Sequence, residues 1–125
     1  MLKAKALTKT LEKGISDKIT TIFLANFEGA LIASAGDVSN EKTTAAVVAN
    51  IWSDYGENIY QLMNQDMSEV FLDCEKGRVY IVRLTHLFLC FCATKETDFG
   101  LLRTTGNGFV RVLEKPLNEI FQESQ

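Results

Sequence analysis

The sequence is short of histidine, proline and cysteine. It has one histidine, one proline and three cysteines among 125 residues. An odd number of cysteines without regular spacing fits a reducing compartment better than a disulfide framework. With one proline, 46% apolar and 23% charged residues, the chain lacks the polar, proline-rich composition of a disordered protein. We therefore expect an ordered globular protein, apart from its ends.

Long apolar runs and an excess of positive charge are also missing. The longest apolar runs, such as LFLCFCA, are far shorter than the roughly 20 residues that cross a bilayer. The N-terminal stretch MLKAKALTKTLEKG interleaves lysines with apolar residues, unlike a signal peptide. The net charge of −3 repels phosphate backbones. We expect a cytosolic or nuclear protein with no nucleic-acid partner, which reaches a membrane only through another protein.

The length is that of a single domain, residues 1–125, which can bury roughly two thirds of its unfolded surface. Apolar residues at helical spacing predict helices over residues 2–14, 41–63 and 98–114, and a short last helix over 117–121. The continuity of the third helix is open because it contains Gly106 and Gly108. An interior glycine costs about 1 kcal/mol relative to alanine.

Five strands are expected between these helices, over residues 19–25, 31–35, 67–75, 78–84 and 87–94. The last strand is apolar on both faces, which is typical of a central strand covered on both sides. The order is helix, two strands, long helix, three strands, helix, with short connections. It predicts an α+β fold in which helices cover both faces of a five-stranded antiparallel sheet.

The long helix over residues 41–63 has a wider apolar surface than one sheet contact requires. One stripe contains Val48, Trp52, Tyr55, Ile59 and Leu62, and a neighbouring row contains Ala45, Ala49 and Trp52. Either the helix is enclosed within its own domain, or it covers its sheet with one face and contacts another protein with the next. The second alternative is favoured in a domain with so few helices.

The histidine and two cysteines share the stretch LTHLFLCFCATKE, but their spacing does not make a catalytic or metal site. On a strand, Cys90 lies about 13 Å from His86, beyond hydrogen-bond reach. The spacing of His86, Cys90 and Cys92 matches no zinc motif. The segment TTGNGF also lacks the spacing and lysine of a phosphate loop. We expect no catalytic residue, metal or cofactor, with a thiol-dependent enzyme built on Cys90 or Cys92 as the alternative.

Four strings of the sequence carry a family resemblance. In order, TTAAVVANIW, FLDCEKGRVYIVRL, HLFLCFCATKET and FGLL resemble the roadblock/LC7 superfamily, and the likeness covers nearly the whole chain. The most specific strings are DC-x-x-GRV-x-I-x-R and KET-x-FG. The resemblance implies a five-stranded antiparallel sheet between a long central helix on one face and the N- and C-terminal helices on the other. The last strand would be central and the third would lie at an edge.

The resemblance also implies a dimer. Two roadblock domains join through their long helices and edge strands into one ten-stranded sheet. The residues that would lie at or beside this interface are Ala45, Val48, Ala49, Trp52, Tyr55, Met67, Glu69, Phe71 and Asp73. One sequence does not show which face of the long helix points toward the partner.

Among superfamily members, the strings are most similar to an adaptor subunit of the Ragulator complex. This likeness implies a non-catalytic scaffold whose partners are a second roadblock-domain protein, the other Ragulator subunits and Rag GTPases. It would serve TOR or MAP-kinase signalling at late endosomes and lysosomes, held at the membrane by a lipidated partner. The alternative is a homodimeric roadblock protein that acts as a dynein light chain or a small-GTPase regulator.

Overall fold

The computed structural model describes residues 4–37 and 41–123, which form three helices and five strands. Their order, helix, two strands, long helix, three strands, helix, is the predicted one. The elements are α1 (Ala4–Glu12), β1 (Ile19–Asn26), β2 (Leu31–Gly36), α2 (Glu41–Met63), β3 (Glu69–Asp73), β4 (Arg78–Leu84), β5 (Leu87–Ala93) and α3 (Phe99–Glu123).

The strands form one sheet in the order β2-β1-β5-β4-β3, and every neighbouring pair is antiparallel. The central position of β5 confirms the prediction from its apolar sequence. Every β5 side chain is buried except that of Cys92, which is half-buried. At the far side of the sheet, β3 pairs with β4 alone and forms an edge, as the resemblance implied.

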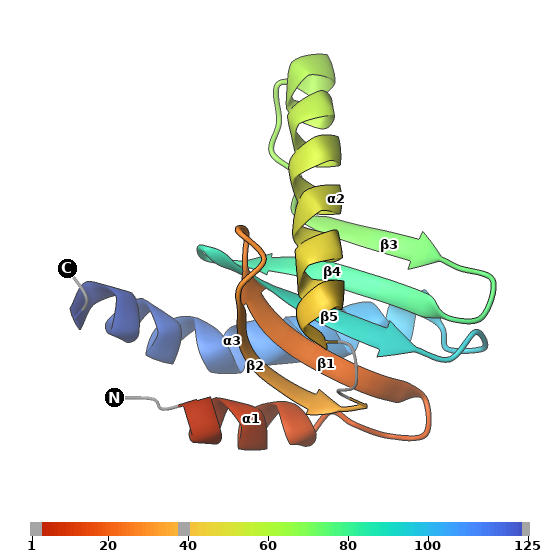
Figure 1. The fold of residues 1–125 in the computed structure, drawn as a ribbon, viewed down its shortest axis with the longest axis vertical. Coiled ribbons are helices and arrows are strands. Elements are labelled where there is room, and N and C mark those ends of the chain that lie inside the picture. The colour runs from red at the N-terminus through yellow and green to blue at the C-terminus, as the bar shows by residue number, and fades with distance from the viewer. Residues whose placement is uncertain (1–3, 38–40, 124–125) are drawn as a thin grey trace.

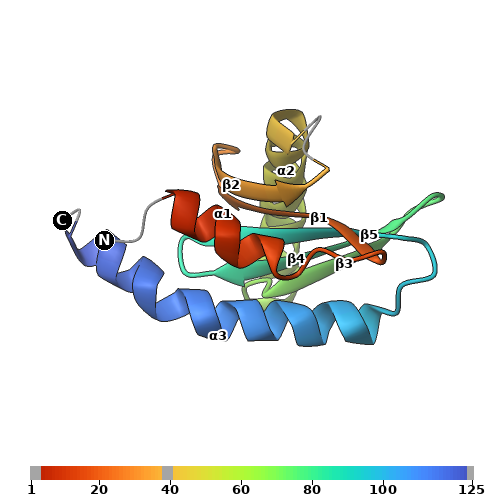
Figure 2. The ribbon, with the colours of Figure 1, turned by 90° about the horizontal axis from the view of Figure 1, so that it is seen from below.

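Helices cover both faces of the sheet, so the chain has two cores (Figure 1). The predicted three-layer α+β fold is therefore confirmed. Helix α2 crosses one face, where Trp52 packs with Phe23 and Phe88. Helices α1 and α3 lie side by side on the other face (Figure 2), over a core that includes Tyr80 and Phe91. Because successive side chains of a strand point to opposite faces, the one sheet contributes side chains to both cores.

Helix α3 differs from its prediction because it is one continuous helix. The expected separate last helix from residue 117 was wrong, and the glycines at 106 and 108 do not split the helix. At Gly106 an added Cβ would lie 2.5 Å from Cε2 of Tyr80, so the missing side chain lets α3 lie directly on the sheet. Packing of its buried side chains offsets the weak helix propensity of glycine.

Strand β3 is shorter than the predicted range of 67–75. At one end, the Cys74 N–H donates to the Gly77 carbonyl and closes the turn to β4. At the other end, the Arg83 N–H donates to the Ser68 carbonyl. The alternation of apolar and polar residues continues beyond both ends of β3. The regular pairing with β4 is confined to the residues between these two contacts.

Candidate functional site: a helix stripe beside an open strand edge

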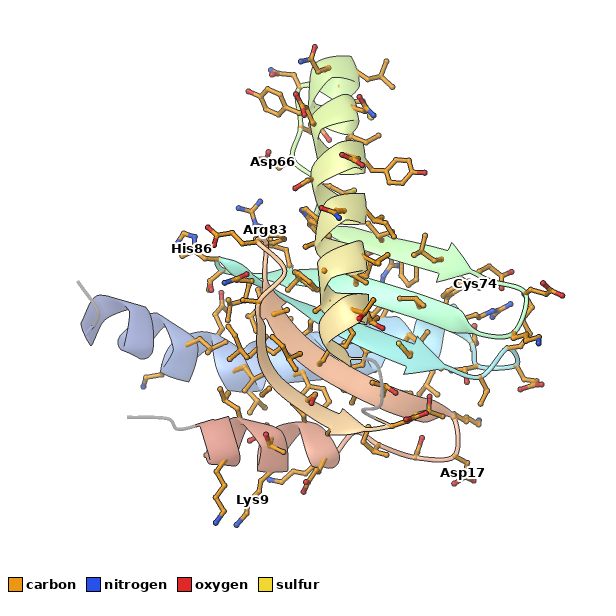
Figure 3. The ribbon with its side chains drawn as sticks, viewed as in Figure 1. Lys9, Asp17, Asp66, Cys74, Arg83 and His86 are labelled. Atoms are coloured by element: carbon orange, nitrogen blue, oxygen red, sulfur yellow. The ribbon has the colours of Figure 1, made fainter. Side chains whose placement is uncertain are left out.

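The side chains suspected of chemistry are separated in the structure. His86 lies in the exposed turn between β4 and β5, whereas Cys74 lies at the opposite end of the sheet (Figure 3). Cys90 is buried in the core under α2, and burial raises the pKa of its thiol well above the usual range. A hydrogen bond from Cys90 lowers the pKa of the half-buried Cys92. Cys90 is therefore a neutral core side chain without a neighbouring imidazole base.

The potential metal ligands of the chain are scattered in the same way. Among residues 4–37 and 41–123, no group of three or more histidine, cysteine, aspartate or glutamate side chains is placed to hold a metal ion. The carboxylates with shifted pKa values, Glu69 and Asp73, are instead paired with basic side chains. Apolar side chains, in contrast, are exposed on α2.

Four of the five α2 residues predicted at a partner interface are buried against the chain's own sheet. Ala45, Val48, Ala49 and Trp52 are between 0% and 8% exposed and belong to the core that α2 shares with the sheet. Small side chains there let the helix approach the large phenylalanine rings of the sheet. The structure thus assigns this face of α2 to the domain itself, whereas Tyr55 is 59% exposed.

A second apolar stripe on α2 is exposed at three positions and half-buried at the other two. Its members recur at positions i, i+4, i+8, i+12 and i+15 of the helix, and they are Val47, Ile51, Tyr55, Ile59 and Leu62. Tyr55 is more than half exposed, and Leu62 at the end of the helix is 80% exposed. Figure 1 shows the reason: the C-terminal half of α2 extends beyond the sheet. We call these five residues the α2 stripe.

The C-terminal part of α2, which carries the last residues of the α2 stripe, extends past β3 at the open edge of the sheet (Figure 1). The other flank of α2 carries Ser53, Glu57 and Tyr60, which line a hollow of about 310 Å³ together with Arg83. The same hollow is lined by Asp66 and Met67, which come just before β3. Because Tyr55 lies roughly opposite Ser53 and Glu57 on the helix, the stripe points away from this hollow.

The backbone of β3 is open along the edge next to this stripe. In an antiparallel ladder, the residues that bond to the neighbouring strand alternate with residues whose N–H and C=O groups point away. The bonds of Ser68 and Cys74 to the β4 side set this alternation. The backbone groups of Glu69, Phe71 and Asp73 therefore point outward, where a further strand can pair with them.

The side chains of these three β3 residues lie on the α3 face of the sheet, within the chain. Phe71 stacks on Tyr80, with ring centroids 4.7 Å apart. Tyr80 Oη donates a 2.7 Å hydrogen bond to Glu69 Oε2, and Arg103 also bonds to Glu69. Partial burial acts to raise the pKa of Glu69, but these hydrogen bonds outweigh it and lower the pKa. The Glu69 carboxylate is thereby held against α3.

Asp73 at the end of β3 is similarly paired. It accepts hydrogen bonds from Lys95 and, at 3.3 Å, from Arg78. The Lys95 bond is the main cause that lowers the pKa of Asp73. Met67, before the strand, is half-buried against the core under α2. The predicted β3 region thus contributes its backbone to the open edge and most of its side chains to the domain.

Sequence reasoning missed Val47 and Ile51 as surface residues. Their spacing to Tyr55, four residues at each step, was visible in the sequence. What it could not show was which of two adjacent apolar rows covers the sheet. The alanines contact the sheet together with Val48 and Trp52 of the other predicted row. The remaining members of that row join Val47 and Ile51 in the α2 stripe.

Comparison with known sequences matches most of the chain to one domain family. Residues 6–93 match the Roadblock/LC7 domain. The chain is 28% identical over 126 residues to a protein of Caenorhabditis elegans described as a Ragulator complex protein LAMTOR2 homolog, and the match covers 96% of each chain. In the part of the chain that the structure describes, no helix is both long and apolar enough to cross a membrane.

Solved structures share the fold at low sequence identity. A Roadblock/LC7 domain from Streptomyces avermitilis aligns with a TM-score of 0.80 at 16% identity, over 93% of this chain and 98% of that one. MglB from Myxococcus xanthus aligns with a TM-score of 0.75 at 21% identity, over 81% and 78%. The gliding protein MglB from Thermus thermophilus aligns with a TM-score of 0.81 at 15% identity, over 93% and 91%.

Proposed function

This chain belongs to the Roadblock/LC7 domain family, and from that membership we propose that it is a non-catalytic scaffold subunit that heterodimerises with a second roadblock-domain protein. The interface consists of the α2 stripe and the open edge of β3. The observation that carries the proposal is that these two features lie on the same side of the domain. A partner with the same fold can pair its strand with β3 and place its helix against the stripe at the same time.

The two contacts supply different kinds of interaction. Strand pairing satisfies outward N–H and C=O groups of β3 and sets the register of the partner. Helix packing buries the exposed apolar side chains of Tyr55 and Leu62, at about 25 cal/mol per Å² of apolar surface removed from water. An apolar patch that is exposed on a small domain often marks a surface that binds another protein.

The cellular role that we propose is that of a Ragulator-type adaptor. The support is the 28% identity to a protein described as a Ragulator complex LAMTOR2 homolog, over 96% of both chains. In this role the dimer joins other Ragulator subunits, recruits Rag GTPases and brings TOR or MAP-kinase signalling to late endosomes and lysosomes. A lipidated partner subunit holds the assembly at the membrane.

Two exposed tyrosines on α2 give a matched test of the interface. Tyr55 lies in the α2 stripe and is 59% exposed, whereas Tyr60 lies on the flank near Arg83 and is 52% exposed. With the second roadblock-domain protein from the same genome, Tyr55→Glu should weaken the heterodimer about tenfold or more, because a charge replaces a buried ring. Tyr60→Glu should leave the affinity within about twofold. Isothermal titration calorimetry measures both.

Equal effects of the two substitutions would contradict this interface. Circular dichroism of each variant shows whether it is folded before binding is compared. If the wild-type chain stays monomeric with every roadblock-domain protein of its genome, by gel filtration with light scattering, heterodimerisation itself is wrong.

A self-associating roadblock protein is the second candidate. The MglB structures favour it, since this chain shares their fold and one of them is described as having a tetrameric arrangement. In that case the chain is a dynein light chain or a small-GTPase regulator. Sedimentation equilibrium of the chain alone distinguishes the two candidates. A stable homodimer, together with binding to a dynein intermediate chain or a change in GTPase turnover, favours the second.

A further inference from the structure

On the face of the sheet away from α2, a hollow opens between α1 and α3. Its volume is about 360 Å³, and it is lined by Thr10, Lys13, Thr105, Gly108, Phe109 and Val112. Figure 2 shows the two helices side by side on this face. We call this hollow the α1–α3 groove.

The α3 wall of the groove is apolar and partly unfilled. Leu101, Thr105, Gly108 and Val112 follow each other at positions i, i+4, i+7 and i+11, so they lie on one side of the helix. Val112 is 61% exposed and Leu101 is 40% exposed. A Cβ at Gly108 would meet no atom within 4 Å. A segment that enters here can therefore approach the backbone of α3 closely.

The borders of the groove are basic. Lys13 lines it and Lys9 lies one turn earlier on α1, while Arg111 and Lys115 lie within three residues of Val112 on α3. All four side chains are exposed. This is notable in a chain with a net charge of −3.

Two acidic residues of these helices, Glu12 and Glu114, lie away from the residues that line the groove. Glu12 and Glu114 are each two positions beyond a groove-lining residue, Thr10 and Val112 respectively. Two positions along a helix turn a side chain to roughly the opposite side. The groove thus combines an apolar floor with cationic borders, and Glu12 and Glu114 point away from it.

We propose that the α1–α3 groove docks an amphipathic helix of a partner protein, with apolar residues toward Phe109 and Val112 and acidic residues toward the lysines and Arg111. The walls determine the conformation of the docked segment. They are helices whose backbone groups bond internally, so they offer no strand edge for pairing. An incoming segment has to satisfy its own backbone, which a helix does while it packs into the channel between two others.

This contact is separate from the proposed dimer interface. The groove lies on the opposite face of the sheet from α2, so both surfaces can be occupied at once. One of its walls, α3, begins at Phe99, beyond the residues 6–93 that match the Roadblock/LC7 domain.

The test uses the full chain and three fluorescein-labelled synthetic helical peptides. One has leucines along one face and glutamates on its flanks, the second replaces those glutamates by lysines, and the third has the glutamate sequence scrambled. In fluorescence anisotropy, we expect saturable, salt-weakened binding of the first peptide, at least about tenfold tighter than that of the other two.

Substitutions then locate the binding. Val112→Glu and Lys13→Glu should each weaken the first peptide about tenfold, because one adds an anion to the floor and the other removes a cation from the border. Leu62→Glu on α2 is the matched control, and peptide affinity should not change. Both groove residues are exposed, and urea unfolding checks that the variants stay folded.

Three results would overturn the proposal. They are equal binding of the acidic and basic peptides, no binding of any peptide, and an affinity that the groove variants leave unchanged. Vesicles of phosphatidylcholine with phosphatidylserine form a separate arm. If the chain binds these vesicles and ignores the acidic peptide, the basic face is a membrane-contact surface and the docked-helix proposal is wrong. Dimerisation through Tyr55 is measured independently, so either proposal can fail alone.

Discussion

Gly106 shows how one missing side chain sets the distance between a helix and the sheet. A Cβ at this position would lie 2.5 Å from the ring of Tyr80, which is fully buried. The Tyr80 ring is held between Phe71 and Phe91, and its hydroxyl bonds to Glu69. Because these neighbours leave the ring little room to move, the residue at 106 has to be small.

Substitution of Gly106 and of Gly108 by alanine should therefore have opposite effects. Gly106→Ala should lower the free energy of unfolding by about 1–3 kcal/mol, since overpacking exceeds the gain in helix propensity. Gly108→Ala, where nothing lies within 4 Å of the added Cβ, should raise it by about 0.5–1 kcal/mol. Urea unfolding measures both. A stabilising Gly106→Ala would contradict the close packing against Tyr80.

Among the elements, β3 is the one for which we propose a role of the backbone N–H and C=O groups that do not bond to β4. Its side chains are engaged within the chain, through Phe71 with Tyr80 and through Asp73 with two basic residues. Its outward backbone groups remain available at the edge. Exposed ion pairs of this kind contribute little stability, so in the proposed dimer we expect the strand to act mainly through its backbone.

Two substitutions at Asp73 separate the backbone contribution from that of the side chain. Both Asp73→Ala and Asp73→Pro lose the carboxylate, but only proline also removes the outward N–H. Affinity for the second roadblock-domain protein should fall at least about threefold further in Asp73→Pro than in Asp73→Ala, the equivalent of a net hydrogen bond. Calorimetry with both variants measures this difference. Equal affinities would mean that no partner strand pairs with the edge at this residue.

At the scale of the whole molecule, two cores share one sheet. The only tryptophan, Trp52, lies in the core under α2, whereas Leu113 of α3 is buried in the core on the other face. The central strand β5 contributes to both, with Cys90 to one and Leu89 to the other. We therefore expect residues 1–125 to unfold as a single cooperative domain.

A cavity made in the core under α3 should also lower the stability that Trp52 reports from the core under α2. Leu113→Ala should lower the free energy of unfolding by about 2–5 kcal/mol, through lost burial and an unfilled cavity. The urea midpoints from Trp52 fluorescence and from far-UV circular dichroism should move together. The neighbouring exposed residue is the control, and Val112→Ala should change stability by less than about 0.5 kcal/mol. A fluorescence midpoint that stays constant while the dichroism shifts would indicate two independently unfolding layers.

Much of the fold could be predicted because its signals are local. Helix α2 begins and ends where apolar periodicity placed it, at Glu41 and Met63. The double-sided apolar pattern of β5 predicted a central strand, and the family strings predicted the positions of β3 and β5 in the sheet. The separate last helix expected from residue 117 was wrong, and the continuity that the sequence left open at Gly106 depends on a distant contact. Propensity at Gly106 is local, but the contact with Tyr80 that requires glycine is not.

The sequence by itself determined which residues are apolar, the period at which they recur and the family to which the chain belongs. Tertiary structure decided which apolar row of α2 covers the sheet and which is exposed, because both rows have helical spacing. It also brought α1 and α3 together into a groove with basic borders, from residues about a hundred positions apart in the chain. Periodicity describes one element at a time, whereas an interface exists only after the elements have been placed against one another.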